Sequence, residues 1–300
     1  MLASVLRNVA ELLLPRECVV CGTALLPEEK HICAHCASDI PLTRYERREH
    51  NPMADAFNAR IQERLVTSDG TFEPYSRACA LFFYDAARPY SNITKALKYR
   101  YNRAEGRFFA AMLGARLAAS PLYADVDAVV PVPLHWTRRW KRGYNQAEVI
   151  AAAVAQALPQ AVLRPELLRR VGRTRSQARL SGAAARSANM RGAFRAMAPD
   201  AIQAGRPAAL GHIYPDRVAE QQVPVVAGLP AQRQGDIYPD RVAQQQVPVV
   251  AGPIDQRPGH ILLVDDVFTT GATLGECHAA LRAALGPGVR ISAATLGFVL

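Results

Sequence analysis

ILLVDDVFTTGATLGE, residues 261–276, joins a short apolar run, two adjacent carboxylates and a small, hydroxyl-rich loop. The run ILLV is typical of a buried strand, and TLGECHAALRAAL, residues 273–285, has the apolar spacing of a helix. In α/β folds, ligands bind where strands end and helices begin. The position of Asp265 and Asp266 at such a junction therefore predicts a ligand site.

The same alternation of strands and helices extends over much of the chain. Strands are expected in CALFFYD (79–85), DAVVPVPLHW (127–136) and VRISAATLGFVL (289–300), and helices in KALKYRYNRAEGRFFAAMLGARLAA (95–119) and AEVIAAAVAQAL (147–158). TRRWKRGYNQ (137–146) is expected to be a loop that opens the second helix. Strands that alternate with helices predict an α/β fold with a parallel sheet covered on both faces.

Composition limits the possible partners and compartment. The 300 residues are 50% hydrophobic, enough for one substantial core and a smaller module. The net charge of +10 favours anionic partners such as phosphates, nucleic acid or a membrane surface. No apolar run reaches the roughly 18 to 20 residues of a membrane span, and MLASVLRNVAELLLP, residues 1–15, lacks a basic leader and cleavage site. We expect a cytoplasmic protein whose first helix packs on its body.

Four of the six cysteines form the pattern C-x2-C-x11-C-x2-C. They are Cys18, Cys21, Cys33 and Cys36. Two CxxC knuckles present four thiolates to one tetrahedral ion, and this pattern predicts a structural zinc site. Paired disulfides are the alternative, which a reducing compartment disfavours. His31 or His35 in place of a cysteine ligand is a second alternative.

Composition also suggests how the chain is divided. Residues 1–40 are expected to form an amphipathic helix and a zinc-binding module, 41–77 an irregular polar connector, and 78–300 the main domain. Within that domain, IYPDRVAEQQVPVVAG at 213–228 recurs almost unchanged at 237–252. Its prolines exclude long helices and central strands. The sequence thus predicts an extended, duplicated insertion at about 200–258; a partner-binding or edge-strand role for VPVV is left open.

The acidic pair has two common interpretations. A metal-positioning strand of a nucleoside triphosphatase is excluded, because the chain contains no GxxxxGK[ST] loop. The segment Thr269–Thr273 instead provides hydroxyls, one glycine and the N–H groups of a helix start, which together suit a phosphate monoester. Asp265 and Asp266 can accept hydrogen bonds from ribose hydroxyls. The stretch therefore predicts a site for a ribose 5-phosphate.

ILLVDDVFTTGAT resembles the phosphoribosyl diphosphate signature of type I phosphoribosyltransferases. Similarity to the ComF family within that superfamily extends to the zinc knuckles after an amphipathic helix and to three further motifs. These motifs are LKYRYN (97–102), VVPVPLHWTRRWKRGYNQAE (129–148) and RRVGRTRSQARLSGAAARSANMRGAF (169–194). The resemblance implies a parallel sheet flanked by helices and a small N-terminal zinc-ribbon module. The chain departs from the family at 200–258, where a short connector is expected.

The resemblance also implies roles for individual residues. The 5-phosphate of phosphoribosyl diphosphate would lie on Thr269, Thr270, Gly271, Ala272 and Thr273, with its ribose hydroxyls on the catalytic residues Asp265 and Asp266. Its diphosphate, with Mg(II), would meet Arg138, Arg139, Lys141 and the catalytic Arg142, while Lys98 and the segment 173–177 are candidates for a closing loop. Transfer of ribose 5-phosphate to an unidentified acceptor needs no protein nucleophile, only stabilisation of the departing pyrophosphate.

A second class of function remains open at this point. ComF proteins are associated with DNA uptake in natural transformation, so the chain is alternatively a non-catalytic protein that binds single-stranded DNA or DNA-uptake proteins. Trp136, Trp140 and Tyr144, which lie among arginines, suit base stacking. The edge of a core suits these three side chains equally well.

Overall fold

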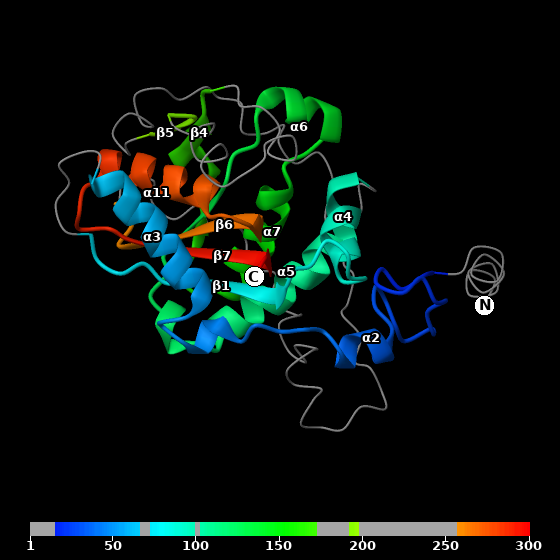
Figure 1. Ribbon diagram of the computed structural model, residues 1–300. Helices are drawn as coiled ribbons and strands as arrows, with labels where there is room; N and C mark the ends of the chain where they lie inside the picture. The colour runs from blue at the N-terminus through cyan, green and yellow to red at the C-terminus, as the bar shows by residue number, and fades with distance from the viewer. Residues whose placement is uncertain (1–15, 67–72, 100–102, 173–191, 198–256) are drawn as a thin grey trace.

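Five parallel strands form the central sheet, in the order β1-β7-β6-β2-β3. They are β1 (Ala78–Phe83), β2 (Ala128–Pro131), β3 (Val162–Leu163), β6 (His260–Phe268) and β7 (Arg290–Phe298). The computed structural model describes residues 16–66, 73–99, 103–172, 192–197 and 257–300 (Figure 1). The predicted α/β fold with a parallel sheet is confirmed.

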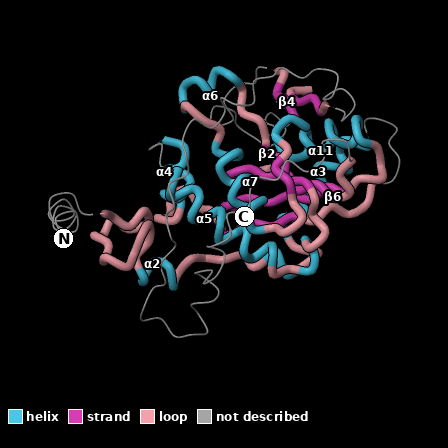
Figure 2. Tube along the Cα trace, turned by 180° about the vertical axis from the view of Figure 1, so that it is seen from behind, coloured by secondary structure: helices cyan, strands magenta, loops and turns pink. Residues whose placement is uncertain are grey.

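Helices cover both faces of this sheet. Two of them, α5 (Arg103–Ala118) and α7 (Gln146–Ala157), pack on each other and on one face, and α3 (Pro52–Val66) and α11 (Ala272–Leu285) pack on the other (Figures 1 and 2). The chain steps from β2 outward to β3 but from β6 in the opposite direction to β7. The order therefore reverses between β2 and β6, and in such sheets ligands bind at the reversal point.

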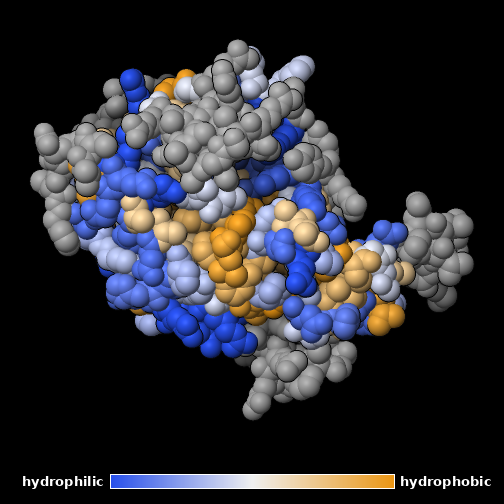
Figure 3. Space-filling model, in the orientation of Figure 1, coloured by the Kyte–Doolittle hydropathy of each residue, from blue (hydrophilic) through white to orange (hydrophobic). Residues whose placement is uncertain are grey.

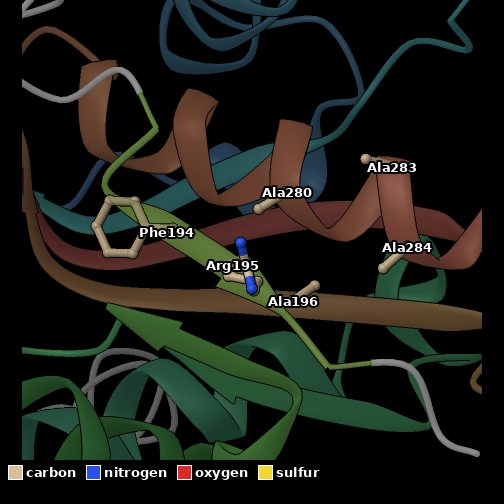
Figure 4. A pocket seen from close by; sticks show the side chains of 6 residues that line it. All are labelled: Phe194, Arg195, Ala196, Ala280, Ala283 and Ala284. Carbon is tan, nitrogen blue, oxygen red and sulfur yellow. The ribbon is translucent and has the colours of Figure 1, made fainter. Parts of the chain in front are cut away.

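A small antiparallel hairpin lies beside α11. It consists of β4 (Leu168–Arg170) and β5 (Phe194–Ala196). Figure 4 shows a shallow pocket between β5 and α11, lined by Phe194, Arg195, Ala196, Ala280, Ala283 and Ala284. This lining offers one charged side chain and no carboxylate, so the pocket lacks the groups expected of the ribose site.

The expectation of an irregular connector over 41–77 was wrong, because Pro52–Val66 forms the helix α3. Met53, Phe57 and Ile61 recur every four residues and are buried. The charged and polar residues between these positions lower the average hydropathy and conceal the amphipathic spacing. The start of the segment is also ordered, since Leu42 forms an antiparallel bridge to Phe82 on the edge strand β1.

Two further elements differ from the prediction. The expected loop at 137–146 begins with a short helix, α6 (Trp136–Arg142), capped by the side chain of His135 and ended by Gly143 in the left-handed region. In place of the long helix expected at 95–119, the structure describes α4 (Ser91–Tyr99) and α5, and residues 100–102 lie outside the described ranges. The N-terminal helix and the repeat at 213–252 lie outside the described residues.

The visible surface is mostly hydrophilic in the orientation of Figure 1. Figure 3 shows a hydrophobic patch near the centre of this face, where the chain ends, and Leu300 is 85% exposed. None of the helices in the described ranges has both the length and the apolarity that a membrane span requires.

The close contact between α5 and α7 gives a test of this packing. A Cβ atom on Gly114 would lie 2.8 Å from the Cβ of Ala157 and 3.2 Å from the Cα of Val154. Gly114→Val should therefore destabilise the protein by about 1–3 kcal/mol through overpacking. Gly288→Val is the control, because a Cβ there meets nothing within 4 Å. Equal melting temperatures for the two variants in thermal denaturation would contradict the packing.

Candidate functional site

The acidic pair lies near the carboxyl end of β6, at the point where the strand order reverses. The strand does not end on the aspartates as predicted, because Val267 and Phe268 continue its pairing with β7. Val264 pairs with Pro131 of β2, and Asp265 pairs with Thr295 of β7. The backbone N–H of Asp266 donates a hydrogen bond to the carboxylate of Asp265 at 2.9 Å. The loop that follows β2 and the loop that follows β6 therefore open on the same edge of the sheet.

Lys98 places a positive charge beside the two aspartates. Its Nζ lies 2.7 Å from Oδ2 of Asp266, and the two side chains are 24% and 15% exposed. Burial alone would lower the pKa of Lys98, but the charges of Asp266 and Asp265 and the hydrogen bond to Asp266 outweigh it and raise the pKa. Lys98 is thus held charged beside the acidic pair, and it lies on the helix α4 and not on a closing loop.

The pKa of Asp265 is set by its burial and by the charges around it. Burial, followed by the negative charge of Asp266, raises the pKa of Asp265 to about 7. The hydrogen bond from the Asp266 N–H and the charges of Lys98 and Arg170 act in the opposite direction. A carboxyl with this pKa changes its charge near neutral pH, a property common in functional sites.

The loop from Thr269 to Thr273 turns sharply into α11. Gly271 precedes the helix with φ of 71° in the left-handed region, which favours glycine. A Cβ atom there would lie 2.6 Å from Cζ of Phe268 and 3.4 Å from Cγ of Arg60. Arg60 of α3 also donates from Nε to the carbonyl of Thr270 at 2.8 Å. The loop is therefore fixed, and Ala272 and Thr273 form the first turn of α11 with the N–H groups of a helix start.

The predicted cations after β2 lie on α6 and differ in their burial and in their partners. Arg138 is half-buried, and burial followed by the charge of Arg142 lowers its pKa. Arg139 pairs with Glu148 of α7 at 3.3 Å, and Arg142 donates to Gln146 at 3.1 Å. The side chain of Lys141 and the segment 173–177 lie outside what the structure describes.

The three aromatic residues near these cations differ in their solvent exposure. Trp136 and Trp140 are 70% and 84% exposed, so they are not part of a core edge. Tyr144 is buried, its hydroxyl donates to the carbonyl of Leu97, and the guanidinium of Arg103 lies over its ring. Stacking is therefore available to the two tryptophans and not to Tyr144.

Sequence reasoning missed two arginines. Arg170, at the end of β4, interacts electrostatically with Asp265 and Arg138, and burial followed by Arg138 lowers its pKa. Arg60 supports the loop before α11. The basic run around Arg170 was visible, but neither arginine has a spacing that distinguishes it from solvated surface residues, since only the tertiary fold brings them to this edge.

The four predicted cysteines converge in the N-terminal module. All four sulfur atoms lie within 4.8 Å of one another, and those of Cys21 and Cys33 are 3.8 Å apart. Four sulfurs around a tetrahedral zinc with bonds of about 2.3 Å would be about 3.8 Å apart. The donor set and its dimensions therefore fit a structural ion such as zinc.

The histidines near the knuckles are not part of this cluster. His31 packs against Phe108, with ring centroids 5.4 Å apart, and burial followed by the charges of Lys30, Arg16 and Arg107 lowers its pKa to about 4. His35 lies on the surface, 3.8 Å from Asp39. Within the described residues, the metal-binding group consists of the four cysteines alone.

Comparison with known proteins gives one partial match. No family model matches the chain. The chain is 38% identical over 68 residues to Competence protein F of Haemophilus influenzae (strain ATCC 51907 / DSM 11121 / KW20 / Rd). This match confirms the ComF resemblance. The aligned segment is 23% of this chain and spans only 29% of the relative.

The cysteine cluster predicts a metal content of about one zinc ion per chain. Cys21→Ser should abolish it, because a structural site needs all four ligands. Cys79→Ala is the control, since this buried cysteine lies on β1 and not in the cluster. Metal analysis after purification without chelator measures the result. A wild-type protein that is folded, free of zinc and reactive at all four thiols would rule the site out.

Proposed function

We propose that this chain binds phosphoribosyl diphosphate at the carboxyl edge of its sheet. The observation that carries the proposal is the acidic pair of Asp265 and Asp266 next to the Gly271 loop, at the point where the strand order reverses. Phosphates bind at helix starts, where N–H groups are free of intrahelical partners. The 5-phosphate would lie on Thr269–Thr273 and the ribose hydroxyls on the two carboxylates.

The diphosphate would extend toward α6 and the β4–β5 hairpin. Arg138 and Arg170 interact electrostatically, and the charge of Arg170 also reaches Asp265. Burial lowers the pKa of both arginines, and so does a neighbouring charge, that of Arg142 for Arg138 and that of Arg138 for Arg170. A nearby anion would therefore stabilise their charged forms. Mg(II) is commonly held by one or two carboxylates together with substrate phosphates, so Asp265 and Asp266 are its candidate protein ligands.

This arrangement supports transfer of ribose 5-phosphate to an acceptor. The bond between C1 of the ribose and the diphosphate oxygen would break, the acceptor would bond to C1, and pyrophosphate would leave with both electrons. Arg138, Arg142 and Arg170 would stabilise the charge that develops on the pyrophosphate. We also propose, from the relative's name and the ComF resemblance, a cytoplasmic role in competence and DNA uptake.

A second candidate function is binding of single-stranded DNA without turnover. The observation in its favour is the exposure of Trp136 and Trp140 on a helix that also carries Arg138 and Arg139. Exposed aromatic rings beside cations form stacking platforms for single strands. Pyrophosphate release with a range of acceptors would identify the transferase. Salt-dependent oligonucleotide retention that is lost in Trp140→Ala, without any pyrophosphate release, would identify the DNA-binding protein.

The site predicts the effects of two substitutions on donor binding. Asp266→Asn should weaken binding of phosphoribosyl diphosphate with Mg(II) about 10- to 150-fold, because a charge-assisted hydrogen bond contributes about 1.5–3 kcal/mol. Gly271→Val should abolish binding, since valine resists the left-handed backbone and its Cβ would meet Phe268.

Calorimetric titration measures both effects. Asp39→Asn is the matched control, because Asp39 is exposed in the N-terminal module and should leave binding unchanged. Absence of binding to the wild type, or wild-type affinity in Gly271→Val, would refute the proposed site.

The pKa of Asp265 predicts a pH dependence of binding. Because its pKa is about 7, Asp265 is largely protonated at pH 6 and charged at pH 8. The charged carboxylate accepts hydroxyl hydrogen bonds more strongly, so donor affinity should rise between pH 6 and 8. Asp265→Asn should retain only the weaker dependence that arises from the phosphates of the donor. Identical pH profiles for the two proteins would show that Asp265 does not contribute.

A further inference from the structure

The helix α4 and the residue before it contact the N-terminal module at one end and the proposed donor site at the other. Just before it, the hydroxyl of Tyr90 donates to the carbonyl of Cys36 at 2.9 Å. In its first turn, the amide of Asn92 donates to the carbonyl of Val20 at 3.2 Å. At its other end, Lys98 pairs with Asp266. Figures 1 and 2 both show α4 between the N-terminal module and the sheet.

The position of α4 depends on its contacts. It has nine residues, and helices this short are marginal in isolation. Ile93 and Leu97 are buried, and a Cβ on Gly106 of α5 would lie 2.2 Å from Cδ1 of Leu97. From Tyr90 to Lys98 a helical rise of 1.5 Å per residue gives roughly 12 Å. Because α4 is short and packed along its length, a displacement of its first turn would also displace Lys98 in its last turn.

The two carbonyls that accept these hydrogen bonds at the start of α4 belong to the two CxxC knuckles. Val20 lies between Cys18 and Cys21, and Cys36 is itself one of the four cysteines. The ion would hold these two carbonyls at a fixed separation, because it joins both knuckles. In small modules of this kind, metal binding supplies much of the folding free energy. Loss of the ion would thus release the acceptors of Tyr90 and Asn92.

We propose that α4 couples the cysteine site to the sugar-phosphate site, with Tyr90 and Asn92 as positioning residues that hold Lys98 against Asp266. The donor-affinity part of this inference rests on the proposed function. Zinc then raises the affinity of the protein for phosphoribosyl diphosphate without contacting that ligand. By linkage, the donor raises the affinity for zinc by the same factor.

Hydrogen exchange on the full chain tests the coupling directly. Removal of zinc from the wild type with a chelator should increase amide exchange in residues 91–99, while β6 and α11 stay protected. The double variant Tyr90→Phe with Asn92→Ala should keep one zinc per chain, exchange faster in 91–99, and bind the donor about 3- to 10-fold more weakly. Ser38→Ala is the control, because it removes a hydrogen bond to His35 inside the module and leaves α4 untouched.

Two results would overturn the inference. One is unchanged exchange in 91–99 after zinc removal while the module itself opens. The other is wild-type protection of α4 in the zinc-loaded double variant. Failure of the wild type to bind the donor would refute the proposed function instead, and exchange would still decide whether α4 responds to the metal.

Discussion

Two adjacent carboxylates at the end of a buried strand are the constraint on which the site depends. Partial burial and mutual repulsion both disfavour the charged forms, and in Asp265 they raise the pKa to about 7. Lys98 offsets this cost at Asp266 through a contact of 2.7 Å, and Arg170 acts on Asp265. The helix that carries Lys98 and the hairpin that carries Arg170 are therefore held at this edge by electrostatics as well as by packing.

The topology explains how such distant segments meet. Because β2 and β6 are parallel neighbours, their carboxyl ends lie at the same edge, with α6 after one and the Gly271 loop after the other. The chain diverges in opposite directions along the sheet from these two strands, toward β3 and toward β7, so neither of the connections through α7 and α11 joins β2 to β6. The cations and the carboxylates of the site converge at this edge.

The parts that could be predicted from the sequence are those with strong local signals. The apolar run before Asp265 and the spacing of the four cysteines need no tertiary information, and both are found as expected. The helix α3 was missed because charged residues interrupt its apolar face. The helix α6 was missed because WTRRWKR has no amphipathic period, and its boundaries are set by His135 and Gly143.

The candidate site was harder to predict than the fold, because it combines segments that only packing brings together. Arg60 lies 210 residues before the carbonyl of Thr270 to which it donates. Arg170 lies on a hairpin whose second strand begins 24 residues later, and Lys98 reaches Asp266 across the sheet edge. Resemblance suggested Lys98 only as part of a closing loop. That Lys98 pairs with Asp266 could be found only from the structure.

The N-terminal module is structurally continuous with the sheet. Val19, Val20 and Ile32 belong to the same buried cluster as the strands. The chain that leaves the module then covers the edge strand β1, where the N–H of Phe83 donates to the carbonyl of Pro41 at 2.8 Å. An exposed parallel edge would invite association with other strands. A metal ion in the module would therefore stabilise both the knuckles and the covered edge of the sheet that carries the acidic pair.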